Sequence, residues 1–341
     1  MLTITYPDKV TLAHTPTPLQ PLRRLQADTG GPLIWLKRDD MTGSTLSGNK
    51  VRKLEFIAAK AINNNFTALV TCGGIQSNHC RATALVAAQL GLRCHLILRG
   101  EPIDGAVADG NLLLNELSGC SISYHSSAYY NTNLSELFRL TENQLQAEGH
   151  RVFNVPTGGS NGDGIWGYIA AAEELCRDFC HYGIHPQSII VATGSGGTQA
   201  GLMTGMSCFD SSISVYGVNV CDDASYFSSK IQQDITDWHS KYPLEAEPFN
   251  CGELLKARVN IIEGYVGDGY AIANAAVLAT ISRMSRLEGV VFDPVYTGKA
   301  FHGLLSEIKK GRFLDQKDLV FVHTGGLFGL FPFAKQLASS H

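Results

Sequence analysis

The sequence contains no apolar segment near the roughly 20 residues that a membrane span needs, and no long basic run. Residues 1–20 lack a basic stretch followed by an apolar one, which a secretory signal would have. Charged residues make up only 17% of the 341, and the formal net charge is −4. These absences argue against a membrane protein and against binding to nucleic acid or an anionic membrane surface. We therefore expect a cytoplasmic protein with a small-molecule ligand.

Paired cysteine motifs are also missing. The nine cysteines are scattered without a C-x-x-C pattern, so we expect reduced thiols and no disulfide framework. Cys176 and Cys180 stand one helical turn apart beside His181, but a metal site would need a second cluster of ligands. We therefore expect no metal.

Strand, glycine loop and helix alternate along most of the chain, which is the repeating unit of a parallel sheet. Strands are predicted over residues 33–37, 68–72, 94–98, 121–124, 151–155, 188–192, 214–220, 290–295 and 319–323. The length suits about two domains, and the glycine-rich residues 155–164 are the best candidate for a domain crossing. We expect two open, twisted, mostly parallel α/β domains: residues 1–45 with 155–341, and an inserted smaller domain at 46–154.

Lys50 is the first candidate for chemistry. Apolar residues recur at helical spacing from Val51 onward, so a helix is predicted with Asn49 as its N-cap and Lys50 in its first turn. A helix N-terminus favours anions, so the pKa of an ammonium group there should fall. A partly neutral lysine is a nucleophile suited to Schiff-base chemistry. The ordinary alternative is a solvated lysine beside a flexible loop.

The loop T-G-S-G-G-T follows a predicted strand and opens a helix. Its residues are Thr193, Gly194, Ser195, Gly196, Gly197 and Thr198. Backbone N–H groups at a helix N-terminus, with the hydroxyls of the loop, form a cradle for a phosphate. A dinucleotide fingerprint would need glycine where Gln199 stands, and a P-loop would need Ser or Thr where Val51 stands. A monophosphate fits best, and a plain tight turn is the alternative.

A second glycine loop, G-G-I-Q-S-N-H, ends in Ser77, Asn78 and His79 at another predicted helix N-terminus. Its N–H groups suit a carboxylate, and the Asn78 amide can donate to an anionic oxygen. Helix capping is the alternative interpretation. No nucleophile elbow of the form G-x-S-x-G is present, so Ser77 is not expected to act in a catalytic triad.

Three further motifs place hydroxyl side chains where predicted strands end and helices begin. These are G-D-G-Y with Tyr270, D-P-V-Y-T-G-K with Tyr296 and Thr297, and H-T-G-G with Thr324. The carboxyl edge of a parallel sheet is where α/β proteins bind ligands. Singly, each tyrosine is more often a wall residue with a bonded hydroxyl.

Taken together, S-G-N-K-V-R-K-L-E, G-G-I-Q-S-N-H, V-P-T-G-G-S-N, T-G-S-G-G-T-Q-A-G, D-P-V-Y-T-G-K and H-T-G-G resemble the family of D-cysteine desulfhydrase and 1-aminocyclopropane-1-carboxylate (ACC) deaminase. These are pyridoxal-phosphate enzymes of the tryptophan synthase β-subunit-like fold, known as fold type II. The likeness covers nearly the whole chain. It implies a homodimer with the cofactor between two domains, and it implies these contacts: Lys50 as the Schiff-base lysine; Lys53 and residues 193–198 on the phosphate; Asn78 on the pyridine 3-oxygen; Thr324 near the cofactor; Ser77, Asn78, His79 and Thr297 on the substrate; Tyr270 and Tyr296 at the reacting centre.

Two positions separate the branches of this family. Cyclopropane-opening deaminases typically carry Glu and Leu where this chain has Thr297 and Thr324, so the resemblance favours the D-cysteine desulfhydrase branch. A carboxylate near the pyridine nitrogen strengthens electron withdrawal, and a hydroxyl withdraws less. Expelling a thiolate needs less withdrawal than opening a carbon ring. The resemblance therefore implies α,β-elimination of D-cysteine to hydrogen sulfide, ammonia and pyruvate.

Several alternatives stay open at this point. Sulfite release from L-cysteate and elimination from β-chloro-D-alanine or D-serine would need the same residues. ACC deaminase activity is a further alternative within the family. The α-proton could be taken by Lys50, Ser77 or Tyr270. Two alternatives belong to other functional classes. One is a nicotinamide-dependent oxidoreductase that uses residues 193–198, and the other is a catalytically silent metabolite-binding protein.

Overall fold

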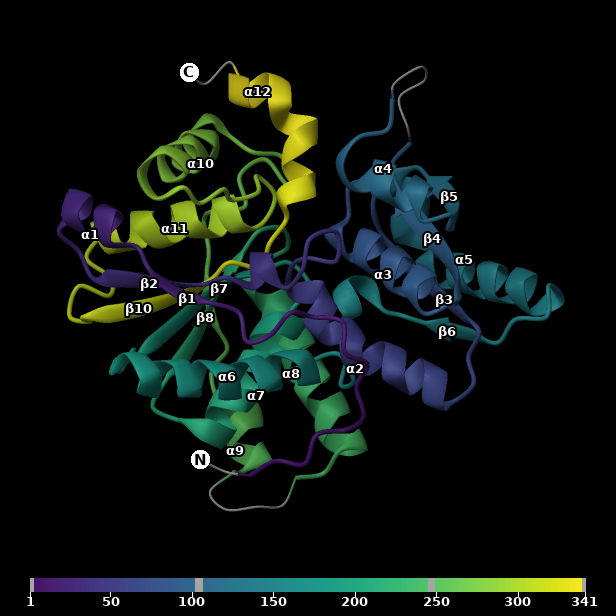
Figure 1. The fold of residues 1–341 in the computed structure, drawn as a ribbon, viewed down its shortest axis with the longest axis horizontal. Helices are drawn as coiled ribbons and strands as arrows, with labels where there is room; N and C mark the ends of the chain where they lie inside the picture. Colours follow the sequence, from purple (N-terminus) through teal and green to yellow (C-terminus); the bar gives the residue numbers. More distant parts are fainter. Residues whose placement is uncertain (1–2, 102–106, 245–248, 339–341) are drawn as a thin grey trace.

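The computed structural model describes residues 3–101, 107–244 and 249–338, and within them two sheets lie side by side (Figure 1). The larger sheet contains β1 (Leu19–Pro21), β2 (Leu33–Lys37), β7 (Ser188–Thr193), β8 (Ser214–Asn219), β9 (Asn260–Ile262) and β10 (Asp318–Val322). Its strand order is β1-β2-β10-β7-β8-β9. Neighbouring strands are parallel, except that β1 pairs antiparallel with β2.

The smaller sheet contains β3 (Ala68–Gly74), β4 (Arg93–Arg99), β5 (Ser121–His125) and β6 (Val152–Asn154), in the order β5-β4-β3-β6. All its neighbouring strands are parallel. Its helices are α2 (Asn49–Asn63), α3 (Asn78–Gln89), α4 (Gly110–Leu117) and α5 (Ser127–Ala147). The predicted fold class, two mostly parallel α/β units, is confirmed. The domain limits at residues 46 and 154 stay a prediction.

Helices cover both faces of the larger sheet (Figure 1). They are α1 (Arg23–Thr29), α6 (Trp166–Tyr182), α7 (Gly197–Phe209), α8 (Ala224–Lys241), α9 (Cys251–Lys256), α10 (Ala275–Glu288), α11 (Thr297–Lys309) and α12 (Ala334–Ala338). Three short 3₁₀ helices complete the described structure: η1 (Asp39–Met41), η2 (Thr157–Gly159) and η3 (Leu327–Phe333). Among the helices described, none is long and apolar enough to cross a membrane.

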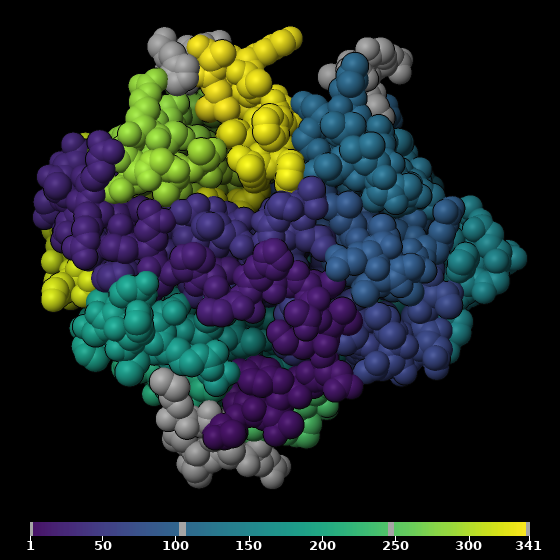
Figure 2. All heavy atoms as spheres, viewed as in Figure 1, coloured from purple at the N-terminus to yellow at the C-terminus, as the bar shows by residue number. Residues whose placement is uncertain are grey.

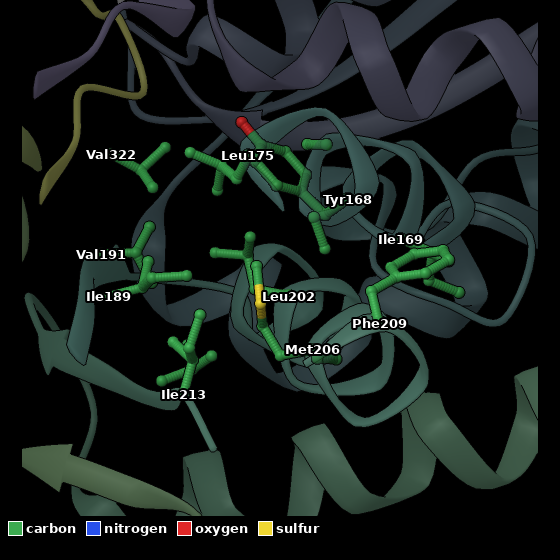
Figure 3. Packing of buried hydrophobic residues seen from close by; sticks show 14 of the residues in the cluster. Tyr168, Ile169, Leu175, Ile189, Val191, Leu202, Met206, Phe209, Ile213 and Val322 are labelled. Carbon is green, nitrogen blue, oxygen red and sulfur yellow. The ribbon is translucent and has the colours of Figure 1, made fainter. Parts of the chain in front are cut away.

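Strand β7 shows how the larger sheet supplies two cores. Ile189 and Val191 point into the core shared with α6 and α7, whereas Ile190 points into the core under α10 and α11. Successive side chains of a strand face opposite sides, so a strand buried on both faces is a continuous apolar run. Figure 3 shows Ile189 and Val191 packed near Leu202 and Met206 of α7.

Helices α6 and α7 pack closely because α7 has glycine on the face that meets α6. A Cβ atom at Gly201 would lie 2.5 Å from the Cβ of Tyr168, and one at Gly205 would overlap Ala172. Glycines four residues apart lie on one face of a helix. This close approach holds the N-terminus of α7, and the glycine loop before it, rigidly against the core.

The N-terminal segment ties the two units together. Figure 2 shows it lying across the face in view, against α6 and beside the helices of the smaller unit. Glu55 of α2 accepts hydrogen bonds from the backbone N–H groups of Leu12 and Ala13, each at 2.9 Å. Tyr6 donates to Glu173 of α6 at 2.8 Å.

One predicted strand is wrong. Residues 290–295 form no strand, because the Asp293 carboxylate accepts the N–H groups of Val295, Tyr296 and Thr297 and folds the segment into a turn that opens α11. Both edges of β10 are also already paired, with β2 and β7. The short elements β1, β9 and α9 were not predicted, and the helix expected over residues 270–287 begins only at Ala275.

Candidate active site

A cavity of about 460 Å³ is lined by residues from both units, at the carboxyl ends of the parallel strands. Most of the residues predicted for the site border it: Lys50, Ser77, Asn78, His79, Thr193, Gly194, Ser195, Gly196, Thr198, Tyr270, Tyr296 and Thr324. Three predicted residues, Lys53, Gly197 and Thr297, are not among its lining residues. This edge is where parallel α/β sheets gather side chains from separate loops.

Lys50 stands in the first turn of α2, as predicted, and its amine donates to the carbonyl of Gly158 at 3.4 Å. Burial lowers its pKa from 10.5 to about 8, because a charged ammonium is poorly solvated there. The direction agrees with the sequence prediction, but the cause is desolvation. The predicted N-cap is wrong: Gly48 occupies that position, and the Asn49 side chain donates instead to Thr198 at 2.9 Å.

A buried ion network anchors α2 just below Lys50. The Arg52 guanidinium is 3% exposed and donates to Asp39 at 2.8 Å and to Glu174 at 3.0 Å. Tyr168 donates to the same Asp39 at 2.6 Å. Such a network fixes the position of the helix because each buried charge depends on its partners.

The glycine loop 193–198 has the form of an anion cradle. Helix α7 begins at Gly197 after Gly196, whose φ of 84° suits glycine. Lys53 lies fully buried behind the loop, where its amine donates to Ser160 at 3.3 Å and would lie 2.9 Å from a Cβ at Gly197. Burial, followed by the nearby charge of Lys50, holds the pKa of Lys53 well below its usual range. A bound anion would offset that cost.

Lys230, which the sequence did not indicate, adds a further cation at this end of the cavity. Its amine donates to the carbonyl of Ser160 at 3.1 Å and to the carboxylate of Asp234. Asp234 is 3% exposed, and burial raises its pKa. The hydroxyls of Ser160 and Ser195 lie 2.9 Å apart, so Ser160 links Lys53, Lys230 and the loop.

Ser77 and Asn78 begin helix α3. The Ser77 hydroxyl accepts the N–H of Cys80 at 3.2 Å, so capping and a cavity-facing role coexist in one residue. Asn78 accepts a hydrogen bond from the fully buried Asn111 at 3.0 Å, and Arg81 donates to Asn111 at 2.9 Å. This contact occupies the side-chain oxygen of Asn78, so the NH₂ group of Asn78 is the part that can donate a hydrogen bond to a ligand.

His79 is buried and neutral. One ring nitrogen lies 2.8 Å from the Thr71 hydroxyl. Burial, then the charges of Lys50 and Lys53, hold the His79 pKa well below its usual range. It therefore brings no positive charge to a substrate carboxylate, which would be bound by N–H and O–H donors.

Tyr270 and Tyr296 form a hydroxyl pair, with their oxygens 2.8 Å apart. Burial raises the pKa of both phenols, so both are proton donors at neutral pH. Lys299 is 1% exposed and donates to the carbonyls of Val266 and Gly269 at 2.6 and 2.7 Å. It thereby holds the loop that carries Tyr270.

The two branch-separating threonines occupy different surroundings. Thr324 borders the cavity two residues after the end of β10. Thr297 is fully buried, and its hydroxyl donates to Asp293 at 2.7 Å. The expectation of a substrate contact at Thr297 is therefore not supported, because its side chain caps the turn at Asp293.

Sequence reasoning missed several lining residues, among them Cys72, Arg99, Tyr130, Cys221 and Lys230. Arg99 is the last residue of β4. Because ligands bind at the carboxyl ends of parallel strands, examining the last residue of every predicted strand could have identified it. Lys230 and Asn111 do not end a strand, and no sequence pattern indicated them.

Among the described residues no group of three His, Cys, Asp or Glu side chains could hold a metal ion.

The residues present fit a phosphate-bearing aldehyde. A cavity-facing amine with a pKa of about 8 suits condensation with an aldehyde. The glycine loop, backed by Lys53, suits a phosphate. We propose that the predicted cofactor contacts on Lys50, Lys53, Asn78, Thr324 and residues 193–198 apply here.

Comparisons with known proteins agree with this fit. The chain matches the family described as "Pyridoxal-phosphate dependent enzyme" over residues 10–325. It is 39% identical over 338 residues to the mitochondrial bifunctional D-cysteine desulfhydrase/1-aminocyclopropane-1-carboxylate deaminase of Arabidopsis thaliana, covering 96% of this chain and 80% of that protein. It is 36% identical over 333 residues to the D-cysteine desulfhydrase of Klebsiella pneumoniae (strain 342), covering 96% and 97%.

Among solved structures, an ACC deaminase homologue matches with a TM-score of 0.85 and 31% identity over 98% of this chain and 96% of that one. The family match, the level of identity and the shared fold all lead to one assignment. This chain belongs to the pyridoxal-phosphate-dependent enzymes of fold type II, in the family that includes D-cysteine desulfhydrase and ACC deaminase.

Proposed function

We propose that this chain catalyses α,β-elimination of D-cysteine, with hydrogen sulfide, ammonia and pyruvate as products. The observation that carries the proposal is that one cavity brings together the Lys50 amine, the loop ending in Ser77 to His79, and the Tyr270–Tyr296 pair. The names of the Arabidopsis and Klebsiella relatives support the same substrate. Thr324, which borders the cavity where ring-opening relatives typically carry Leu, favours D-cysteine over ACC.

The cofactor supplies an electron sink for the pair of electrons that remains when the α-proton leaves. Lys53 and residues 193–198 would hold its phosphate and so would keep the cofactor near the Lys50 amine. The substrate carboxylate binds the N–H groups at the start of α3, the Ser77 hydroxyl and the Asn78 amide. These contacts fix which bond at the α-carbon faces the base.

Lys50 is the best placed proton acceptor. With a pKa of about 8, roughly a tenth of its amine is neutral at pH 7 and about half at pH 8, so its Nζ can take the α-proton. Tyr270 is poorly suited to that step because its raised pKa keeps it protonated. Its phenol can instead donate a hydrogen bond to the sulfur as the bond to the β-carbon breaks. Ser77 stays a second candidate for the proton.

The test is product analysis with the purified, cofactor-loaded protein. D- and L-cysteine, ACC, L-cysteate, D-serine and β-chloro-D-alanine are supplied separately, and sulfide, sulfite, ammonia and 2-oxo acids are measured. We expect sulfide and pyruvate in equal amounts from D-cysteine. A 2-oxo acid from ACC without sulfide from D-cysteine would assign the ring-opening activity instead. If no substrate gave a product, the result would favour the alternative of a catalytically silent metabolite-binding protein.

A homodimer and a cytoplasmic location belong to the same proposal. The homodimer rests on the family resemblance, and the location rests on the composition of the chain. Sedimentation of the purified protein tests the first, and we expect twice the chain mass of 36.9 kDa. Fractionation of the source cells tests the second.

A further inference from the structure

Arg99 lies at the carboxyl end of β4 and borders the active-site cavity. In the sheet register it is the neighbour of Gly74, the last residue of β3, after which the chain leads to Ser77. Its guanidinium carbon lies 5.2 Å from the centre of the Tyr270 ring and 5.7 Å from that of Tyr130. Stacking on aromatic rings uses the faces of a guanidinium and leaves its N–H edges available for a ligand.

Within the described residues Arg99 makes no ion pair with a carboxylate. Asp222 also lines the cavity, but it does not come within ion-pair distance of Arg99. A cation at a partly enclosed site, without an acidic partner, attracts an anion. The cofactor phosphate and the substrate carboxylate already have other proposed sites, at residues 193–198 and at Ser77 to His79.

The substituent on the β-carbon is the remaining anionic group. The Tyr270 ring contacts the ends of both β3 and β4. A Cβ at Gly74 would lie 3.3 Å from the ring, and the Arg99 guanidinium stacks on it. Arg99 therefore lies beside the phenol that we place near the departing sulfur. A departing hydrosulfide carries a full negative charge, and a guanidinium stabilises such a charge as it develops.

We propose that Arg99 binds the β-substituent of the substrate and selects amino acids whose β-substituent is, or leaves as, an anion. In the elimination, the carbon–sulfur bond breaks with both electrons going to sulfur. The α-proton goes to the base, and hydrosulfide leaves against the Arg99 N–H edge. The chemical class is thus an amino acid whose β-carbon carries a thiol, which leaves as hydrosulfide, or a compact anionic group such as a sulfonate.

This inference deepens the proposed function, and its test separates the two. Cofactor-loaded protein is titrated with alanine and with aspartate, in both enantiomers, and binding is followed by the cofactor's absorption. Aspartate adds a β-carboxylate that cannot leave, so the readout needs no turnover. We expect the wild type to bind aspartate more tightly than alanine of the same hand, by about tenfold to hundredfold for a charge-assisted hydrogen bond.

Arg99→Met should abolish that preference, and Arg99→Lys should keep part of it. Arg151→Met is the matched control, because Arg151 also stacks on an aromatic ring, at 5.0 Å from the Phe66 centre, but lies outside the cavity lining. It should leave the preference unchanged. Equal loss of alanine and aspartate affinity in Arg99→Met would show a merely structural role and overturn the proposal. So would a wild type without the preference.

The proposed D-cysteine activity can fail independently of Arg99. If the wild type releases no sulfide but prefers aspartate through Arg99, the elimination is wrong and the anion site stands. If sulfide is released with no aspartate preference, the anion site is wrong and the elimination stands. For an active enzyme, Arg99→Met should also lower kcat/KM for D-cysteine by about tenfold or more, with partial rescue in Arg99→Lys.

Discussion

The hydroxyl oxygens of Tyr270 and Tyr296 lie 2.8 Å apart in the cavity wall, although the residues come from different loops. Tyr296 is fixed by the turn at Asp293, and Tyr270 by the loop that Lys299 holds. Burial raises the pKa of both phenols, so the pair keeps its protons and can donate to a developing anion.

Tyr270→Phe should slow the elimination by about a hundredfold, which is within the range expected when one catalytic proton donor is lost. Cofactor absorption should not change, because the phenol isn't needed for the proposed contacts with the phosphate or Lys50. The measurement is kcat for D-cysteine. Tyr216→Phe serves as the control, since Tyr216 lies outside the cavity lining. Wild-type turnover in Tyr270→Phe would exclude a catalytic role for the phenol.

The pKa of Lys50 predicts a pH profile for its reaction with aldehydes. Its folded-state pKa is lowered from 10.5 to about 8, so the reactive neutral form increases with pH and reaches half near pH 8. Reductive methylation of the cofactor-free protein, followed at Lys50 by peptide mass spectrometry, should show this midpoint. The Lys50→Ala variant should lack the step and should bind the cofactor without a borohydride-reducible bond. A midpoint near 10.5 would contradict the burial of Lys50.

Gly158→Ala should abolish tight cofactor binding. The residue has φ of 69°, and a Cβ there would overlap the Ser195 hydroxyl and lie 3.2 Å from the Lys50 amine. Gly183→Ala is the matched control, because Gly183 has φ of 62° and nothing within 4 Å of an added Cβ. Both variants should lose about 1 kcal/mol of stability from the left-handed backbone. Titration with the cofactor should show weaker binding by Gly158→Ala than by Gly183→Ala. Equal affinities would mean that a Cβ at position 158 does not crowd Ser195 and Lys50.

Arg52→Met should lower the free energy of unfolding by about 3–5 kcal/mol, because it leaves buried carboxylates without their partner. Asp39 and Glu174 both accept hydrogen bonds from Arg52 within the buried network. Arg139→Met is the control: its pair with Glu136 is on the surface, with 60% of the Arg139 side chain exposed, and should change stability little. Urea unfolding of the cofactor-free variants gives the comparison. Similar midpoints would mean that the network does not anchor α2.

Thr324→Leu should lower D-cysteine turnover by about tenfold or more, because a larger apolar side chain replaces a hydroxyl at the cavity wall. Thr324→Ser, which keeps the hydroxyl, should retain most activity. The paired change Thr297→Glu is less informative, since it would bury a second carboxylate against Asp293. Unchanged kcat/KM in Thr324→Leu would weaken the assignment to the desulfhydrase branch.

Much of the fold could be predicted from local pattern. Strand β2 was predicted to the residue, and the glycine loops before α3 and α7 were correctly placed after strands. The failures have local causes that hydrophobicity does not reveal. Residues 290–295 are apolar enough for a strand, but a single carboxylate, Asp293, takes the N–H groups that a strand would need.

The candidate site divides in the same way. The sequence by itself determined that Lys50 lies in the first turn of a helix, that the glycine loop at residues 193–198 leads into α7, and that Ser77 and Asn78 begin α3, because each depends on a few adjacent residues. Only the tertiary structure decided that Arg99 and Lys230 border the cavity, that Asn111 orients Asn78, and that Thr297 faces away. Those facts depend on contacts between segments far apart in the chain, and on side-chain directions that packing and hydrogen bonds select.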